Sequence, residues 1–320
     1  MAVADNNRKP PERGARKFAR LPIAVDRSAP RLSKPDWLRV RARTHDEASR
    51  RVTQILSENR LSTICREAAC PNIGECFSHG TAAFLIMGSV CTRRCPFCDV
   101  AHGRPEPLDA QEPLRLANAV RAMELSHVVI TSVDRDDLLD GGAGHYAAVI
   151  AALRAAVAGI SVEILVPDFR GRLQKALDIL GREPPDVFNH NLETVPSLYR
   201  SARPGADYRN SLAVLSGFKS LHPDVPTKSG LMLGLGETDD EVTAVLSDLL
   251  EAGTDIVTIG QYLAPSSAHL PVRRYVHPEE FERWREKAVA MGFKTAFTGV
   301  FVRSSYHAGE VARSTSHGAK

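Results

Sequence analysis

The feature that most constrains the fold is an alternation of short apolar segments with amphipathic ones. The apolar runs predict strands at residues 82–87, 127–131, 162–166, 187–190, 227–233, 256–260 and 294–297. The segments between them predict helices at residues 112–124, 144–156, 173–180, 210–221, 239–251 and 278–291. This repeated order implies βαβ crossovers and parallel strands. Six or seven such units favour a complete or partial β/α barrel, although the pattern alone does not exclude an open sheet.

We therefore predict the α/β class and a partial (β/α)6-type TIM barrel, with an N-terminal cysteine-bearing extension and a short C-terminal tail. Four segments are expected: a flexible basic arm (1–33), the extension with a helix at 45–58 (34–79), the barrel (80–300) and the tail (301–320). The arm is basic and rich in proline, which predicts a solvated segment, and its acidic residues argue against a transit peptide.

Composition argues against several classes of function. Lys and Arg number 41 against 38 Asp and Glu, so the formal charge of +3 does not predict a nucleic-acid-binding protein. No apolar run is long enough to span a membrane, and the N-terminus lacks the apolar core of a secretion signal. We expect a cytoplasmic protein whose six cysteines stay reduced, which favours metal or redox chemistry over disulfides.

All six cysteines fall into two triplets. The upstream triplet has the spacing C-x4-C-x5-C and consists of Cys65, Cys70 and Cys76. The downstream triplet has the spacing C-x3-C-x2-C, follows the first predicted strand and consists of Cys91, Cys95 and Cys98. Structural zinc normally takes four protein ligands, whereas three cysteines suit a [4Fe–4S] cluster with one iron left for another ligand. Zinc binding or an inert structural role remains the alternative. This alternative has more weight for the upstream triplet than for the downstream one.

The downstream triplet, with Phe97 before its last cysteine, resembles the signature of the radical S-adenosylmethionine (SAM) superfamily. The upstream triplet resembles the auxiliary-cluster motif of the lipoyl synthase family. Two further segments resemble that family: Lys34-Pro-Asp-Trp-Leu-Arg39 near the N-terminus and Arg303-Ser-Ser-Tyr306 near the C-terminus. These landmarks extend from residue 34 to residue 306, so the likeness covers nearly the whole chain.

The resemblance implies insertion of two sulfur atoms, at C6 and C8, into an octanoyl chain carried on a lysine of another protein. It assigns one [4Fe–4S] cluster, which cleaves SAM to a 5′-deoxyadenosyl radical, to the downstream triplet. A second [4Fe–4S] cluster, the sulfur source, is assigned to the upstream triplet, with Ser305 as its fourth ligand. Without this family context, Ser304 and Ser305 would simply cap or hydrogen-bond the tail.

The SAM site is expected at strand ends, where a β/α barrel carries its functional residues. Its glycine-containing segment at 230–237 resembles the adenine-side strand of the superfamily. The candidates are Thr131, Ser132, Asp134, Asn189, Asn191, Glu193, Gly234 and Glu237. Two rival interpretations remain open: the hydroxyls cap the next segment, and the glycines shape a turn.

The expected partners are octanoylated lipoyl carrier domains, from E2 subunits of 2-oxoacid dehydrogenases or from the glycine cleavage H protein, and an electron donor. No nucleic acid and no membrane are expected. Another radical SAM enzyme would share the downstream triplet but would explain neither the upstream spacing nor the Arg-Ser-Ser-Tyr segment. A non-catalytic zinc or iron–sulfur module would leave the long β/α body without a purpose.

Overall fold

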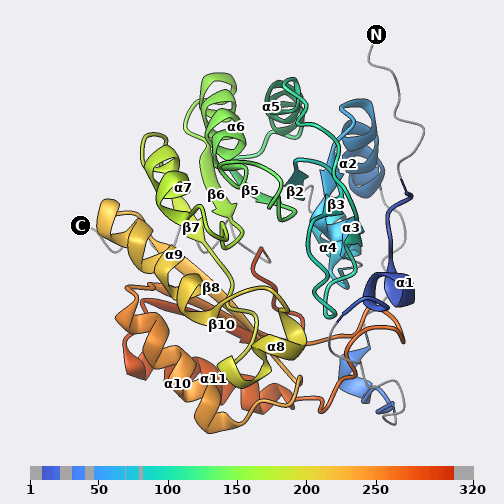
Figure 1. Cartoon of the computed structure of the whole chain (residues 1–320), viewed down its shortest axis with the longest axis vertical. Helices are drawn as coiled ribbons and strands as arrows, with labels where there is room; N and C mark the ends of the chain where they lie inside the picture. Colours follow the sequence, from blue (N-terminus) through green and yellow to red (C-terminus); the bar gives the residue numbers. More distant parts are fainter. Residues whose placement is uncertain (1–8, 22–30, 40–46, 69, 79–81, 306–320) are drawn as a thin grey trace.

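The computed structural model describes residues 9–21, 31–39, 47–68, 70–78 and 82–305. Its centre is an eight-stranded sheet with the order β1-β2-β5-β6-β7-β8-β9-β10 (Figure 1). β1 (Ser62–Thr63) pairs with β2 (Ala83–Ile86) in the antiparallel sense. The other pairs are parallel and continue through β5 (His127–Ser132), β6 (Ser161–Leu165), β7 (Val187–Asn189), β8 (Thr227–Leu233), β9 (Ile256–Gln261) and β10 (Thr295–Gly299).

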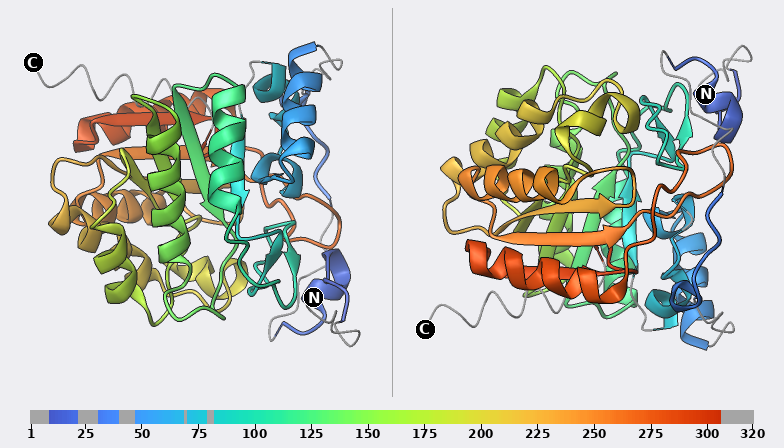
Figure 2. Two further views of the ribbon diagram at one scale, coloured as in Figure 1. Left: turned by 90° about the horizontal axis from the view of Figure 1, so that it is seen from above. Right: turned by 90° about the horizontal axis from the view of Figure 1, so that it is seen from below.

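Helices follow the parallel strands and lie along the outside of the curved sheet (Figures 1 and 2). The six long ones are α5 (Glu112–Ala122), α6 (Ala143–Ala156), α7 (Leu173–Leu180), α9 (Tyr208–Leu221), α10 (Asp239–Glu251) and α11 (Pro278–Met291). The short η2 (Pro196–Leu198) and α8 (Tyr199–Ala202) precede α9. β1 and β10 form the two edges, and no pairing joins them in the described part of the chain. The predicted partial barrel of six strand–helix units is therefore confirmed.

The local sequence explains why these elements form. β9 is buried along its whole length, as expected for a parallel strand covered on both faces. α10 begins with a capping box in which Thr238 and Glu241 satisfy each other's backbone N–H groups. α11 begins with Pro278 directly after the capping residue His277. Because such signals are local, the predicted barrel strands and helices match the observed ends to within two residues.

Most of the N-terminal extension lies beside the β1–β2 edge of the barrel (Figure 1), whereas its Trp37 packs against His277. Its elements are η1 (Asp36–Leu38), α2 (Glu47–Glu58), α3 (Ile64–Glu67) and α4 (Ile73–Ser78). α2 buries Val52, Ile55 and Leu56, the apolar face that its sequence predicts. Residues 45 and 46, which were expected to begin this helix, lie outside the described residues.

The N-terminal arm differs from the solvated segment that its composition predicts. Gly14–Phe18 form helix α1, in which Lys17 is 1% exposed and Phe18 4% exposed. Just before it, Glu12 and His102 exchange two backbone hydrogen bonds of 2.7 and 2.8 Å. Residues 9–21 therefore pack against the loop that carries the downstream cysteines, because tertiary contacts outweigh the polar composition. The boundaries of the four segments themselves stay predictions.

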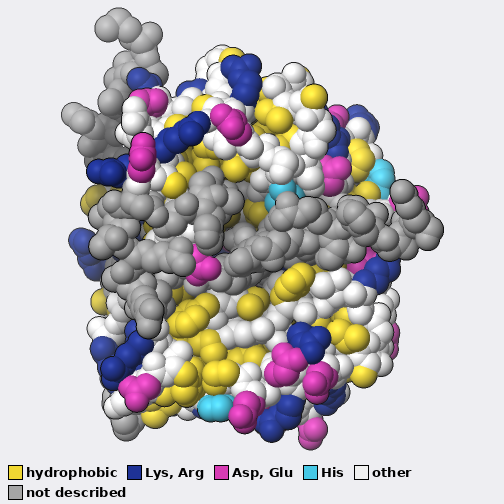
Figure 3. All heavy atoms as spheres, turned by 180° about the vertical axis from the view of Figure 1, so that it is seen from behind, with side chains coloured by type: hydrophobic (Ala, Val, Ile, Leu, Met, Phe, Trp, Pro, Cys, Tyr) yellow, Lys and Arg dark blue, Asp and Glu magenta, His cyan; other side chains and the backbone are white. Residues whose placement is uncertain are grey.

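Surface charge follows the near balance of the sequence. On the face drawn in Figure 3, acidic and basic side chains are interspersed, and hydrophobic side chains gather in the lower half. Among the helices that the structure describes, none is long and apolar enough to cross a membrane.

Candidate functional site

A small parallel ribbon closes the loop of the downstream triplet. β3 (Val90–Cys91) pairs with β4 (Ala101–His102) a short distance after β2. Within the loop, the Cys98 N–H donates to the Cys95 carbonyl at 3.1 Å, and the Gly103 N–H donates to the Cys91 carbonyl at 3.1 Å. Cys91 also lies 3.5 Å from the Asp134 carboxylate, which follows β5. The three cysteines are therefore held at the C-terminal end of the strands, as predicted.

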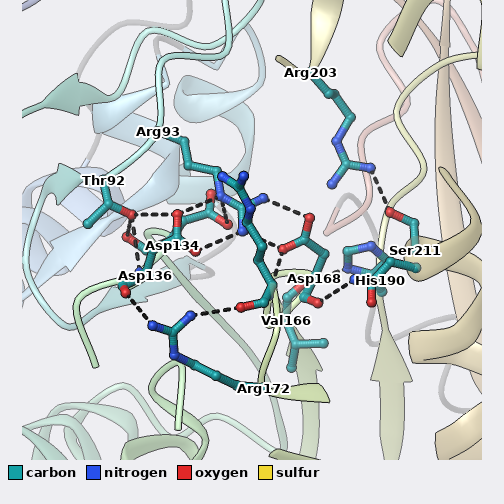
Figure 4. A network of polar contacts seen from close by, with 12 residues as sticks. Thr92, Arg93, Asp134, Asp136, Val166, Asp168, Arg172, His190, Arg203 and Ser211 are labelled. Atoms are coloured by element: carbon teal, nitrogen blue, oxygen red, sulfur yellow. Dashed lines mark hydrogen bonds and ion pairs between the residues drawn. The ribbon is translucent and has the colours of Figure 1, made fainter. Parts of the chain in front are cut away.

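Arg93, inside the loop, anchors it to two strand ends (Figure 4). Its guanidinium donates to the carboxylates of Asp136 at 2.8 Å and Asp168 at 2.7 Å, and it lies 3.4 Å from Asp134. Burial alone would raise the pKa of Asp168, but the hydrogen bonds from Arg93 bring this pKa below its ordinary value. The sequence analysis did not predict a role for Arg93. The three aspartates that follow β5 and β6 were a signal for a cation bound at these strand ends.

The chemistry of the downstream thiols fits a metal cluster. Burial raises the pKa of Cys95 to about 12, and it raises the pKa of Cys91 well above its usual range. The charge of Asp134 and, to a smaller extent, the other two thiols of the triplet raise the Cys91 pKa further. A thiol in such surroundings loses its proton when a strong cation such as iron takes it as a ligand.

The upstream triplet lies outside the sheet, on and between two short helices. Cys65 is in α3, Cys76 is in α4, and Cys70 lies between them. The Cys70 N–H donates to the Cys65 carbonyl at 3.0 Å, and the Cys76 N–H donates to the Asn72 carbonyl at 2.9 Å. Burial raises the pKa of Cys65 to about 11, and the nearby Cys70 raises it further. These cysteines offer the same sulfur donors as the downstream triplet, but they lie on and between short helices instead of directly after a barrel strand.

The C-terminal tail connects the upstream triplet to the barrel. Asn72, between Cys70 and Cys76, donates from its side-chain amide to the Phe301 carbonyl at 2.7 Å. Burial lowers the pKa of Arg303, whereas the charge of Cys70 opposes that shift. A side chain at Gly260 would meet the Val302 carbonyl at 2.1 Å, so the glycine allows the tail to cross β9.

Ser304 fixes the tail inside the barrel. Its hydroxyl accepts a hydrogen bond from the Asn189 amide at 2.9 Å and donates to Asn191 at 2.6 Å. The same Asn189 amide donates to Glu163 at 3.0 Å, and Glu163 forms a fully buried ion pair with Lys228. The tail residue next to Ser304 is Ser305, the predicted ligand, and Tyr306 lies outside the described residues. The predicted ligand is thus carried on a segment tied to both the barrel and the upstream triplet.

Comparison with known proteins decides the family. The model of the radical SAM superfamily matches residues 85–249, which is more than half of the chain. A curated lipoyl synthase of Polaromonas naphthalenivorans is 58% identical over 94% of this chain and 90% of its own length. That of Thioalkalivibrio sulfidiphilus is 59% identical over 96% of this chain and 98% of its own length. The chain belongs to the lipoyl synthase family.

Solved structures confirm the fold. The FeFe-hydrogenase maturase HydG from Carboxydothermus hydrogenoformans superposes with a TM-score of 0.52 at 14% identity, covering 72% of this chain and 65% of its own. Streptococcus suis SuiB bound to its precursor peptide SuiA superposes with a TM-score of 0.51 at 12% identity, covering 71% of this chain and 52% of its own. Because both identities are low, these superpositions show that the barrel fold is shared and say nothing about function.

The predicted SAM residues divide into two groups. Asp134 lies 3.5 Å from the Cys91 thiol, and the charge of Glu193 adds a little to the rise that burial causes in the pKa of Cys98. Glu193 is partly buried, and desolvation raises its pKa. Arg203, which sequence reasoning left unassigned, reaches the same place and donates to the Asn191 carbonyl at 3.1 Å. This group combines cationic and anionic side chains next to the loop.

In the second group, the polar atoms already have partners. The Thr131 hydroxyl donates to the Leu165 carbonyl at 3.0 Å, and the Ser132 hydroxyl donates to the Val133 carbonyl at 2.8 Å. Glu237 accepts three backbone N–H groups, from residues 234 to 236, and so closes a turn. Gly234 has a φ of +103°, which a side chain would strain. Contacts of this group with SAM stay a prediction.

Cluster ligation by the two triplets likewise rests on the donor set. Within the described residues, no group of three His, Cys, Asp or Glu side chains has the arrangement for holding a single metal ion. A [4Fe–4S] cluster differs from a single ion because each cysteine binds a different iron. Three thiols per motif, all buried or partly buried, two motifs and a serine on the adjoining tail are the set that the lipoyl synthase family leads one to expect.

Proposed function

We propose that the protein inserts two sulfur atoms, at C6 and C8, into an octanoyl chain attached to a lysine of a carrier protein. The observation that carries this proposal is the tail, in which Ser304 bonds to the barrel and Phe301 accepts a hydrogen bond from Asn72 of the upstream triplet region. Another radical SAM enzyme needs only the barrel and the downstream triplet. A tail that connects the upstream triplet to the barrel, which also carries the downstream triplet, suits a reaction with two clusters.

In this proposal, Cys91, Cys95 and Cys98 would hold one [4Fe–4S] cluster, and its free iron would take SAM. Bound SAM and the reduced cluster supply a 5′-deoxyadenosyl radical, while the second cluster supplies sulfur. The chain contributes position and environment. Arg93 keeps the loop on the ends of β5 and β6, and the partly buried position of the thiols limits the access of water to them.

Cys65, Cys70, Cys76 and Ser305 would hold the second cluster. Ser305 would offer this cluster an oxygen, which is a harder ligand than a thiolate and would hold its iron less firmly. Ser304 would position Ser305, because its two hydrogen bonds to Asn189 and Asn191 fix the backbone one residue away. The weaker support of α3 and α4 suits a site that must be dismantled and rebuilt.

Asp134, Asn189, Asn191 and Glu193 are the predicted SAM contacts that lie closest to the downstream thiols or to the tail. Thr131, Ser132 and Glu237, whose side-chain oxygens bond to backbone groups, would shape the strand ends around the cofactor, and Gly234 would do so through its backbone. The carrier would be an octanoylated lipoyl domain or the glycine cleavage H protein, and the reducing electrons would come from a separate donor protein. Reduced cysteines favour the cytoplasm.

The test is an anaerobic assay with the reconstituted full chain, SAM, dithionite and an octanoylated lipoyl domain. We expect 5′-deoxyadenosine together with a dithiolated carrier, detected by mass spectrometry. The same domain without the octanoyl group is the matched control and should give no sulfur-containing product. Formation of 5′-deoxyadenosine with no sulfur transfer to any octanoylated carrier would contradict the proposed function and favour another radical SAM reaction.

A further inference from the structure

The N-terminal arm packs on the downstream cysteine loop, although no sequence motif connects the two. α1 lies beside the β3–β4 ribbon in both views of Figure 2. Arg13 donates to the Asp99 carbonyl at 3.2 Å, directly after the loop, and forms an ion pair with Glu67, between two cysteines of the upstream triplet. The Phe18 ring packs edge-on against the His269 ring at 5.1 Å. The arm therefore contacts both cysteine-bearing regions at once.

Lys17 is the arm residue that reaches deepest. Its ammonium donates to the Cys98 carbonyl at 2.8 Å and to the Val100 carbonyl at 2.7 Å, and the residue is 1% exposed. In the part of the chain that the structure describes, no ion pair joins Lys17 to a carboxylate. Two carbonyl oxygens accept hydrogen bonds from this ammonium, but they do not neutralise its positive charge inside the protein.

An unpaired buried ammonium is expensive, so such groups normally lie next to an anion. The charge of Lys17 acts on two cysteines: it opposes the rise that burial causes in the pKa of Cys95 and of Cys98. A [4Fe–4S] core of charge +2 with three thiolates has a net charge of about −1, and one added electron makes it about −2. A cluster on the downstream triplet would therefore be the missing anion.

We propose that Lys17 is a positioning residue whose positive charge stabilises the reduced state of the cluster held by Cys91, Cys95 and Cys98. The inference rests on the proposed function, since it needs a cluster at this triplet. The step concerned is the entry of one electron from an external donor into the cluster, with no bond formed or broken. A fixed positive charge near the cluster favours this step because it attracts the additional negative charge.

The experiment is a redox titration of the reconstituted full chain, followed by electron paramagnetic resonance. The component to read is the one whose spectrum changes when SAM is added, because it reports the cluster with the free iron. Lys17→Gln keeps an N–H donor for the two carbonyls but removes the charge. Lys17→Arg keeps the charge. Arg16→Gln removes the same charge from an exposed position of the same helix and serves as the matched control.

We expect Lys17→Gln to make reduction about tenfold less favourable, which is a fall of ~59 mV in the midpoint potential for one electron. Lys17→Arg and Arg16→Gln should stay within about threefold of the unsubstituted chain, or ~30 mV. Because the spectrum arises only from loaded chains, the potential can be read even when a variant loads less iron.

Equal potentials for Lys17→Gln and the unsubstituted chain would overturn the inference, and so would an equal fall for Lys17→Gln and Lys17→Arg, which would indicate a purely structural role. If the unsubstituted chain has no component that responds to SAM, the proposed function itself fails and the inference falls with it.

Discussion

The loop that carries Cys91, Cys95 and Cys98 follows a buried barrel strand, whereas Cys65, Cys70 and Cys76 lie on and between two short helices beside the barrel. The downstream loop is held by Arg93, whose guanidinium is shared by carboxylates after β5 and β6. The upstream region relies on contacts with the tail, such as the bond from Asn72 to the Phe301 carbonyl.

This difference matches two kinds of chemistry. A centre that acts in every turnover needs a fixed geometry, and rigid strand ends provide it. A centre that is consumed needs ligands that can move apart, and short helices joined to a chain terminus provide that. The two triplets are alike in their donor atoms, so in the proposed reaction the scaffold around each triplet would separate their roles.

The largest expected effect comes from removing one cysteine of each triplet. Cys95→Ala should abolish reductive cleavage of SAM, because it removes a ligand of the cluster that binds SAM. Cys70→Ala should keep measurable cleavage but give no dithiolated product. Both products are measured by mass spectrometry in the anaerobic assay. Sustained 5′-deoxyadenosine from Cys95→Ala, or normal dithiolated product from Cys70→Ala, would show that the roles of the triplets are assigned wrongly.

The tail gives the next largest effect and separates its two serines. Ser305→Ala should leave SAM cleavage in place and reduce sulfur transfer by more than about 100-fold, because it removes a ligand of the second cluster. Ser304→Ala removes only the hydrogen bonds that position this ligand, so we expect a loss of about tenfold. Sulfur transfer per 5′-deoxyadenosine formed is the measurement. The reverse ranking would make Ser304 the ligand.

The anchor of the downstream loop can be tested through stability. Arg93→Met should lower the free energy of unfolding by about 4 kcal/mol, because it leaves the buried Asp168 carboxylate unpaired. Arg94→Met is the matched control, since Arg94 is partly exposed and forms only a long ion pair of 3.7 Å with Glu12; its loss should cost under about 1 kcal/mol. Denaturation under anaerobic conditions measures both. Equal losses would mean that the aspartate network does not support the loop.

Acid should weaken the barrel through His190. Its ring is buried, and burial followed by the charge of Arg203 lowers its pKa from 6.5 to about 4. The unfolded chain therefore binds this proton more readily, so the free energy of unfolding falls as pH drops from 6.5 towards 4, by roughly 3 kcal/mol at most. His190→Gln should remove this decline, measured by denaturation at several pH values before iron is added. A variant that keeps the full decline would show that another group is responsible.

The barrel could be predicted from the sequence because its signals are local. Fully buried strands such as β9 read as apolar runs, and caps such as Thr238 mark where helices begin. The cysteine spacings and the tail segment are local as well. These signals were sufficient for the fold, for the family and for which residues to suspect as ligands.

Contacts between distant residues could not be predicted in this way. Arg93 meets partners 43 and 75 residues away, and Lys17 meets carbonyls more than 80 residues away. Both are buried cations, and composition places such residues at the surface. Their burial depends on hydrogen-bond acceptors that only the folded chain brings together. The sequence therefore predicted a solvated arm around Lys17 and gave no role to Arg93, which lies between two cysteines.

The central claim is that the two triplets hold two separate clusters. Its most direct test is the content of iron, acid-labile sulfide and zinc per chain after strictly anaerobic purification and reconstitution. The account predicts about eight irons with matching sulfide and little zinc, as two [4Fe–4S] clusters require. About four irons would contradict the second cluster and with it the source of sulfur, and stoichiometric zinc with little iron would contradict both clusters.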